Sequence, residues 1–348
     1  MYLSAIHHAV PEYSLKQSDL WEEIKDLKQV HGLESKSQNL LERILLGDNG
    51  IQKRHFASAD VKTLMSSDAG KLNLFFQREA TKLGVQSLGP ALDQSSIDAN
   101  QLDALFVCTC SGYLCPGLSS YIAEQLALPD HIQMADLVGL GCGAAIPTLR
   151  NAWNYLKANP HSNAAVIAVE VCSAAFYLDD DPGVLVSFCL FGDGASASVW
   201  TGEEIGYNGG SCIECKQFDS LHIPKEREKL RFENVKGKLR NKLHRSIPGL
   251  AAEAVEELFL SRSCKEEPDK IVIHPGGKKV LQAVENQINI RRPVESYEVL
   301  SDYGNMSSPS VLFGLEFALR NLDQNSGKIW MSSFGAGLTA YCCEMEIH

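Results

Sequence analysis

The chain has 348 residues, 45% of them hydrophobic, and a formal net charge of −11 at pH 7. Such a length allows one large domain or two fused halves, and the acidic balance argues against broad nucleic-acid binding, which depends on clustered positive charge. No apolar run approaches the roughly 18 to 20 residues that span a bilayer, and the N-terminus lacks the basic and apolar regions of a secretory signal. We therefore expect a cytoplasmic protein without a membrane span.

The N-terminal 80 residues are mixed in pattern and rich in helical segments, with Ser18 expected to cap a helix. Beyond them, buried strands alternate with helices, which indicates a layered α/β fold. Strands are expected at residues 103–109, 134–140, 164–171, 195–201, 270–274, 328–333 and 338–347. Helices are expected at residues 119–126 and 144–158, from 278 through 285, and from 308 through 319.

The second half of the chain repeats the order of the first. In each half a buried strand, a helix, a glycine turn, a second helix and a closing pair of strands follow one another. This repetition suggests an internal duplication, in which two copies face each other and their matched loops meet at a shared centre.

The cysteines indicate reduced thiols. There are 11 of them, an odd number, and several lie within apolar runs, which suits a cytosolic enzyme better than a disulfide framework. Cys212 and Cys215 have the spacing of a metal or redox pair, but no second pair stands at a suitable distance. We therefore predict no metal site and interpret these two residues as part of a strand end.

Cys142 is the exception among these thiols. It lies in the turn Gly141-Cys142-Gly143, between an apolar run and a helical pattern. This places the thiol at a helix N-terminus, where unpaired N–H groups and the positive dipole end favour the thiolate. The two glycines are expected to keep side chains away and to let a substrate approach the sulfur. The pattern predicts a nucleophile, and a buried structural cysteine is the alternative.

Two polar residues downstream complete a set suited to acyl transfer. His274 ends a buried strand before Pro275-Gly276-Gly277, at the sheet edge where sites of α/β folds assemble. Asn305 follows Gly304 ahead of a helical stretch, and alone it would be a helix cap. A cysteine nucleophile with histidine and amide partners is typical of acyl-transfer enzymes.

Six segments, taken together, carry a resemblance to a known family. They occur in the family's order and cover about residues 50–345. They read CTCSGYLCPG at 108–117, GCGAA at 141–145, LFGDGA at 190–195, HPGG at 274–277, LSDYGNMSS at 300–308 and FGAGLT at 334–339. The chain resembles the type III polyketide synthases, the chalcone synthase-like branch of the thiolase superfamily.

The resemblance implies a duplicated, thiolase-like five-layer α-β-α-β-α fold and a homodimer. It places the nucleophile in an N-terminal half, residues 1–203, and the histidine and asparagine in a C-terminal half, residues 204–348. The family uses coenzyme A thioesters as substrates and needs no metal or redox cofactor.

The resemblance also assigns roles by position. Cys142 matches the nucleophile that accepts the acyl group, and His274 and Asn305 match the pair that polarises the thioester carbonyl. Phe191 matches the aromatic gatekeeper between the coenzyme A tunnel and the acyl cavity. Further substrate-contacting positions are occupied by Cys110, Ser187 and Ser307, by Ala175, by Cys115 where a dimer partner usually contributes a residue, and by Asn241 at a second gatekeeper position.

One part of the family pattern is altered. The basic residues that hold the coenzyme A phosphates in plant members correspond here to Leu41, Ile44 and Asp48. Lys278 and Lys279 are candidates to replace them, and so is the basic segment, residues 225–245, which carries nine Lys or Arg against three Glu. That segment is either a solvated face or a landing patch for a phosphate-bearing or acidic acyl carrier.

The predicted activity is the joining of an acyl-CoA starter to malonyl-CoA units by decarboxylative Claisen condensation. The alternative is a ketoacyl-synthase III-like enzyme, or a single-condensation ketosynthase, that uses chains bound to an acyl carrier protein. A non-catalytic relative that binds acyl carriers is a third interpretation, and the presence of Cys142, His274 and Asn305 together argues against it.

Overall fold

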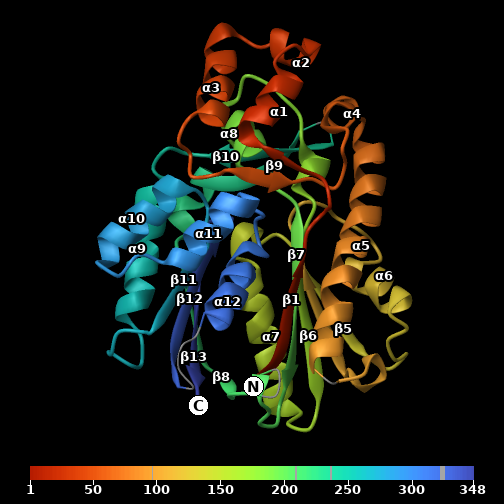
Figure 1. Ribbon diagram of the computed structural model, residues 1–348, viewed down its shortest axis with the longest axis vertical. Coiled ribbons are helices and arrows are strands. Elements are labelled where there is room, and N and C mark those ends of the chain that lie inside the picture. The colour runs from red at the N-terminus through yellow and green to blue at the C-terminus, as the bar shows by residue number, and fades with distance from the viewer. Residues whose placement is uncertain (96, 208–209, 236, 322–325) are drawn as a thin grey trace.

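Two halves of one large sheet and three helical layers form the body of the protein in the computed structural model, which describes residues 1–95, 97–207, 210–235, 237–321 and 326–348. Seen edge-on, the layers run from α9 and α10, through one half of the sheet, the central helices α7 and α12, and the other half of the sheet, to α5 and α6 (Figure 1). The predicted five-layer α-β-α-β-α fold is confirmed. The two chain ends lie together at the pole opposite a cap formed by α1–α3, α8, β9 and β10.

Nine of the described strands hydrogen-bond in the order β11-β12-β13-β8-β1-β7-β6-β4-β5. Their bounds are Tyr2–Ala9 (β1), Ala104–Cys108 (β4), Gln133–Leu137 (β5), Asn163–Glu170 (β6), Gly194–Thr201 (β7), Ile213–His222 (β8), Lys270–Ile273 (β11), Gly327–Gly335 (β12) and Thr339–Ile347 (β13). Two small antiparallel pairs stand apart from this sheet. They are Ser14–Lys16 (β2) with Lys53–His55 (β3), and Leu230–Val235 (β9) with Lys238–Leu243 (β10).

The helices cover both faces of the strands. Their bounds are Gln17–Ile24 (α1), Lys28–His31 (α2), Ser35–Leu46 (α3), Val61–Ser66 (α4), Ala69–Ser95 (α5), Leu118–Gln125 (α6), Ala145–Ala158 (α7), Pro182–Leu190 (α8), Ile247–Leu260 (α9), Lys278–Ile288 (α10), Val294–Tyr303 (α11) and Ser310–Arg320 (α12). Short 3-10 turns lie at Ala99–Gln101, Gly141–Gly143 (η2), Cys172–Ala175 and Pro224–Lys229. Among the residues described, no helix is both long and apolar enough to cross a membrane.

Burial explains why the central elements form. Strands β6 and β7 are covered on both faces, and their sequences are correspondingly apolar or small along nearly the whole length. Helix α10 is amphipathic and buries Val280, Leu281 and Val284 on one side. Helix α12, between the two halves of the sheet, buries nine of its eleven residues. Position in the layers therefore decides whether an element is apolar on one side or on all sides.

The strand order repeats along the chain. One half of the sheet has the order β1-β7-β6-β4-β5 and the other has the order β8-β13-β12-β11. In each half, the strand that comes first in the sequence pairs with the strand that comes last. The halves meet where β1 pairs with β8 through Tyr2 and Glu214. This repeated order agrees with the predicted duplication, and the proposed boundary between residues 203 and 204 stays a prediction.

Three local expectations differ from the structure. The N-terminal segment begins with β1, a central strand that the sequence analysis assigned to a helix-rich region. Ser18 does not cap α1, because that helix begins at Gln17 and the Ser18 hydroxyl donates to Asp19. The basic segment forms the β9–β10 hairpin, and Lys236 within it lies outside the described residues.

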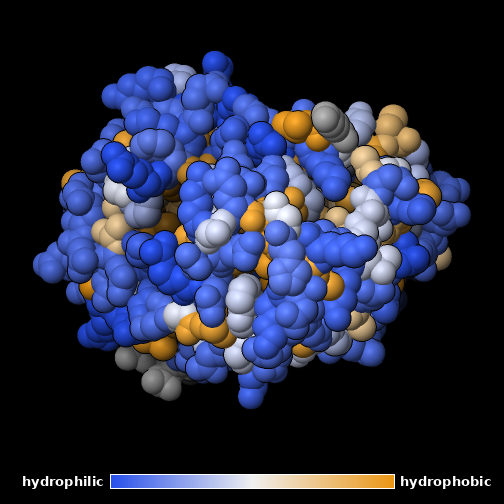
Figure 2. All heavy atoms as spheres, turned by 90° about the horizontal axis from the view of Figure 1, so that it is seen from above, coloured by the Kyte–Doolittle hydropathy of each residue, from blue (hydrophilic) through white to orange (hydrophobic). Residues whose placement is uncertain are grey.

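Viewed from above, the cap has a largely hydrophilic surface with separate hydrophobic clusters (Figure 2).

Candidate active site

The turn that carries Cys142 is shaped by close packing against the β12–β13 connection. Cys142 lies in η2, directly before α7, as predicted. Gly141 has a φ of 60°, and a Cβ atom there would lie 2.9 Å from the backbone nitrogen of Ala336. A Cβ atom on Gly143 would lie 2.8 Å from the ring of Tyr341. The two glycines therefore allow Ala336 and Tyr341 to pack closely against this turn. The role predicted for them was to give a substrate access to the sulfur.

The protonation of the site also differs from the expectation. Burial raises the pKa of Cys142 to about 12, although a hydrogen bond from Ser307 opposes this shift. Burial lowers the pKa of His274 to about 3. Both changes have the same cause, since enclosure in protein penalises the charged form of either group. Burial thus favours a neutral thiol and a neutral imidazole, and it opposes the effect of the helix dipole from which the thiolate was predicted.

His274 stands at the C-terminal end of β11, where the sequence placed it. Its backbone N–H donates to Ser332 in β12 at 2.8 Å, and its ring meets Phe334 edge to face with 5.5 Å between centroids. The side chain is completely buried, and neither ring nitrogen has a hydrogen-bond partner within the described part of the chain. Two buried nitrogens without protein partners are available to a substrate.

Asn305 is held by two backbone groups. Its Oδ1 accepts from the N–H of Ser307 at 2.8 Å, and its Nδ2 donates to the carbonyl of Gly276 at 3.3 Å. Helix α12 begins five residues later with Pro309 at its N-cap position, so Asn305 does not serve as the cap of that helix. One N–H of the carboxamide remains for another acceptor.

Two residues, Ser307 and Gly276, connect the three predicted catalytic residues through their contacts. The Ser307 hydroxyl donates to Cys142 Sγ at 3.3 Å, and the same residue binds Asn305 through its backbone. Gly276, which accepts from Asn305, lies against the imidazole, because a Cβ atom on it would be 3.6 Å from His274 Nε2. The structure thus brings the three side chains to one place.

Cys110 and Ser307 lie beside Cys142. Cys110 Sγ and Ser307 Oγ are 3.0 Å apart. Ser307 has a φ of 62°, which is unusual for a residue with a side chain. The backbone of Met306 is fixed by the Ser310 hydroxyl at 2.9 Å. A conformation of this kind persists only where the surroundings enforce it, and here it presents the hydroxyl to the sulfur.

Glu170 is a buried carboxylate that the sequence analysis missed. It is completely buried at the end of β6 and accepts hydrogen bonds from five groups in two loops. The donors are the Thr109 hydroxyl, the Cys110 N–H, the Ser111 N–H and hydroxyl, and the Ser308 hydroxyl. Glu170 therefore ties the Cys110 loop to the Asn305–Ser308 loop. The sequence did contain a signal for this role, because Glu170 is the single charged residue at the end of an otherwise largely apolar strand.

Phe191 lies next to Asn305. The two residues form a β-bridge, in which Asn305 N–H donates to Leu190 and Gly192 N–H donates to Asn305. Arg54, also missed, is completely buried beneath them and donates to the carbonyls of Phe188 and Phe191 at 2.7 and 2.6 Å. Its side chain also packs where a Cβ atom of Gly304 would stand. Arg54 thereby holds the predicted gatekeeper against the asparagine loop.

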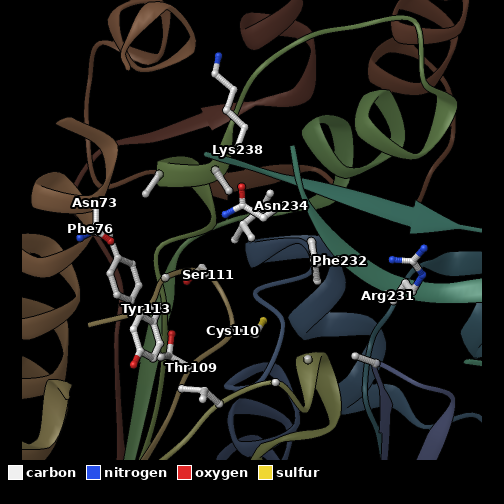
Figure 3. Close-up of a pocket in the computed structure, with 18 of the residues that line it drawn as sticks. Asn73, Phe76, Thr109, Cys110, Ser111, Tyr113, Arg231, Phe232, Asn234 and Lys238 are labelled. Atoms are coloured by element: carbon white, nitrogen blue, oxygen red, sulfur yellow. The ribbon is translucent and has the colours of Figure 1, made fainter. Parts of the chain in front are cut away.

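Two adjoining cavities open beside this cluster. The inner chamber has a volume of about 40 Å³ and is walled by Phe176, Phe188, Phe191, Ser187 and Ser307 among others. The outer cavity has a volume of about 600 Å³ and shares Cys110, Ser111, Ala175, Phe232 and Leu239 with it. In Figure 3 Cys110 and Phe232 point into the outer cavity, whereas the charged ends of Arg231 and Lys238 point away from its centre. Ser307, which contacts Cys142, lines the inner chamber, so this space opens near the predicted nucleophile.

The candidate phosphate ligands Lys278 and Lys279 lie at the start of α10. Leu41, which stands where plant members carry a basic residue, is buried in the core of the cap. Lys278 begins α10 and pairs with the exposed Asp48, while Lys279 beside it is exposed. Both lysines follow the His274 loop directly, so they remain candidates for a coenzyme A phosphate.

Two other predicted regions lie at the surface. Cys115 is exposed in the loop that follows β4 and takes no part in the cluster of Cys142. Most charges of the basic segment are paired, for example Arg240 with Asp179 at 2.7 Å and Lys242 with Asp181 at 3.1 Å. The segment is thus a hairpin wall whose charges are largely compensated, and its role in carrier binding stays a prediction.

The structure does not bring Cys212 and Cys215 together as a metal pair. Cys215 lies 3.8 Å from Cys343, sulfur to sulfur, while Cys212 lies near Glu204 and His348. Within the described ranges, this last trio is the one group of His, Cys, Asp and Glu close enough to hold an ion, and two of its members are exposed.

Comparison with known protein families identifies the chain. Residues 5–209 match the family described as FAE1/Type III polyketide synthase-like protein. Residues 220–344 match the C-terminal domain of chalcone and stilbene synthases. The chain belongs to the type III polyketide synthase family. Membership makes it an acyltransferase and confirms the resemblance drawn from the six segments.

Individual relatives agree with this assignment. A 1,3,6,8-tetrahydroxynaphthalene synthase of Streptomyces peucetius is 28% identical over 321 residues, covering 90% of this chain and 84% of the relative. A 3,5-dihydroxyphenylacetyl-CoA synthase of Amycolatopsis orientalis is 32% identical, covering 68% of this chain and 66% of the relative. The comparisons support a polyketide synthase and not the alternative ketoacyl-synthase III-like enzyme.

Solved structures confirm the fold. The tetrahydroxynaphthalene synthase of Streptomyces coelicolor superposes with a TM-score of 0.86 at 23% identity, over 100% of this chain and 98% of that one. A polyketide synthase of the brown alga Ectocarpus siliculosus gives a TM-score of 0.87 at 22% identity, over 99% and 97%.

Proposed function

We propose that this type III polyketide synthase loads an acyl starter from coenzyme A onto Cys142 and extends it with malonyl-CoA units. The observation that carries the proposal is the convergence of Cys142, His274 and Asn305 through Ser307 and Gly276. An acyl-accepting thiol, two donors for a carbonyl oxygen and an adjoining apolar chamber are the parts that this chemistry requires.

Loading begins from neutral groups. Cys142 attacks the thioester carbonyl while His274, whose ring nitrogens have no hydrogen-bond partner among the described residues, accepts the thiol proton. The C–S bond to coenzyme A then breaks, and the proton passes from the imidazole to the departing thiolate. A protein thioester and free coenzyme A result.

Extension requires donors for an enolate oxygen. Malonyl-CoA loses carbon dioxide, and the electron pair of the broken C–C bond forms the enolate of acetyl-CoA. A ring N–H of His274 and the free N–H of Asn305 donate to its oxygen. The enolate carbon attacks the acyl group on Cys142, a C–C bond forms, and the sulfur leaves as a thiolate that takes up a proton.

The proposal also covers the oligomeric state, the cellular compartment and the acyl donors. We propose a homodimer, because β5 is an edge strand of the large sheet and Tyr113, Met134 and Val138 near it are exposed. We also propose that the enzyme acts in the cytoplasm on coenzyme A thioesters, with no metal or redox cofactor. The proposal includes an acyl carrier protein as a second donor, for which the basic segment would be the contact.

The nucleophile is tested with Cys142→Ala. After incubation with acyl-CoA, intact mass spectrometry is expected to show acylation of the unaltered enzyme and none of the variant, while some malonyl-CoA decarboxylation persists. Cys264→Ala, a cysteine outside the cluster, is the matched control and should be acylated normally. Acylation of the Cys142→Ala variant would refute the assignment.

A further inference from the structure

Two residues that line the inner chamber, Tyr177 and Asn241, carry buried polar atoms without a hydrogen-bond partner among the described residues, and the proposed chemistry uses neither atom. Asn241 in β10 lines the chamber, and its side chain is only 4% exposed. Its Oδ1 has no hydrogen-bond partner in the described part of the chain. A buried acceptor without a partner is uncommon and costs about 1 to 3 kcal/mol.

The orientation of this carboxamide follows from its neighbour. The Ser187 hydroxyl donates its single hydrogen to the carbonyl of Gly183 at 2.6 Å. Ser187 Oγ can therefore only accept from Asn241, whose Nδ2 lies 2.8 Å away. The NH2 group must face Ser187, so Oδ1 is the atom left over.

Asn241 is also fixed along the strand. On either side of it, Arg240 and Lys242 pair with Asp179 and Asp181 in the segment before α8. Gly183 in α8 permits the close approach, because a Cβ atom there would lie 2.4 Å from the backbone oxygen of Asn241. These contacts hold the strand in place, so the Asn241 side chain cannot easily move to another partner.

The rest of the wall defines what this oxygen would bind. Phe176, Phe188 and Phe191 supply aromatic surface, and no Asp or Glu lines the chamber among the described residues. A cationic donor would find no counter-charge, so a neutral donor is favoured. Ser307, which contacts Cys142, lines the same chamber, so a group attached to the sulfur can reach it.

We propose that Asn241 Oδ1 accepts a hydrogen bond from a hydroxyl group on the acyl starter. The chamber then selects hydroxyl-bearing acyl thioesters over apolar ones of the same size. This inference rests on the proposed function and names the starter class of that same site. A pocket built around a polar contact rejects the analogue that lacks the partner, because its own polar atom stays unpaired.

The test uses pairs of coenzyme A thioesters in which a methyl group replaces the hydroxyl. The pairs are 3-hydroxybutanoyl with 3-methylbutanoyl, 4-hydroxybutanoyl with pentanoyl, and 4-hydroxyphenylacetyl with 4-methylphenylacetyl. The rate of enzyme acylation is measured for each by mass spectrometry. We expect a tenfold to hundredfold preference for the hydroxyl compound in at least one pair. The absence of a preference in all three would overturn the proposal.

Variants assign the preference to this residue. Asn241→Leu should abolish or reverse it, whereas Asn241→Asp, which keeps an acceptor of the same shape, should retain it. Asn100→Leu, at an exposed site before β4 and at the far end of that strand from Cys110, should also retain it. A preference that survives in Asn241→Leu, or that Asn241→Asp loses, contradicts the assignment.

Failure of the inference is distinguishable from failure of the proposed function. Malonyl-CoA decarboxylation is measured in the same preparations. If decarboxylation and acylation both occur without a preference, only the role of Asn241 is wrong. If no thioester acylates the enzyme and malonyl-CoA stays intact, the proposed function fails and the starter class fails with it.

Discussion

Glu170 and His274 occupy similar places and differ in how their polar atoms are satisfied. Each stands at the C-terminal end of a strand of the large sheet, and each is completely buried. Glu170 accepts hydrogen bonds from five groups, whereas the two ring nitrogens of His274 have no partner among the described residues. Enclosure alone therefore does not tell a structural polar group from a reactive one.

The difference separates two kinds of buried polar residue. A carboxylate with a full set of donors stabilises the loops that supply them, and it has little capacity left for a substrate. An imidazole without partners contributes nothing by hydrogen bonding to stability, and its donor and acceptor remain available. Replacing the first should affect stability, and replacing the second should affect activity.

The largest effect is expected on activity in His274→Gln. Loss of a donor to the enolate oxygen should lower the rate of malonyl-CoA decarboxylation about a hundredfold to a thousandfold. The free energy of unfolding should change by less than about 1 kcal/mol, because no protein hydrogen bond is lost. Decarboxylation assays and urea unfolding measure the two quantities, with His131→Gln at an exposed site as the control. A large loss of stability without loss of activity would reverse the assignment.

The opposite result is expected for Glu170→Gln. The amide NH2 would face backbone and hydroxyl donors, so the unfolding free energy should fall by about 2 to 4 kcal/mol. Urea unfolding measures this change, and Glu124→Gln on the exposed face of α6 provides the matched control. An unchanged stability would mean that the five hydrogen bonds do not hold the two loops together.

A smaller effect follows from the pKa of His274, which burial lowers from 6.5 to about 3. Above pH 6.5 the imidazole is neutral in both folded and unfolded chains and does not influence stability. Below pH 6.5 the unfolded chain binds a proton that the folded chain does not bind until about pH 3, so stability falls as the pH falls. Between pH 7 and pH 5 this loss should be about 2 kcal/mol.

The pH effect is isolated by comparing the enzyme with its His274→Gln variant. Between pH 7 and pH 5 the unfolding free energy of the unaltered enzyme should fall by about 2 kcal/mol more than that of the variant, because only the unaltered enzyme carries this imidazole. Parallel curves for the two proteins would show that His274 titrates normally and is accessible to protons in the folded state.

Local patterns were enough to predict where the three candidate catalytic residues lie in the fold. The glycine turn around Cys142, the strand end at His274 and the Gly304-Asn305 step are all short-range features, and each lies where the sequence placed it. The protonation of Cys142 was not predictable in this way. The helix dipole is a local effect, whereas the burial that outweighs it arises from segments distant in sequence.

Other parts of the site depend on contacts that sequence patterns do not report. The donors to Glu170 lie about 60 and 138 positions away along the chain. The basic segment was interpreted from its charges, although alternation along β9 and β10 was present. Phe232, Leu239 and Asn241 line the inner chamber, and the neighbouring Arg231, Arg240 and Lys242 form ion pairs. That period of two was the missed signal.

The same distinction between paired and unpaired groups predicts the smallest effect, in the basic segment. Arg240 and Lys242 have acidic partners, whereas the exposed Lys225 and Arg245 have none among the described residues. Lys225→Gln with Arg245→Gln should raise the KM for acyl-CoA about twofold to fivefold at low salt and less at high salt, because unpaired charges attract an anionic donor over a screened distance. Arg240→Gln and Lys242→Gln should act mainly on the hairpin, lowering stability by up to about 1 kcal/mol. Steady-state kinetics at two salt concentrations measure the difference, and an unchanged KM in the first variant would leave this surface as a solvated face.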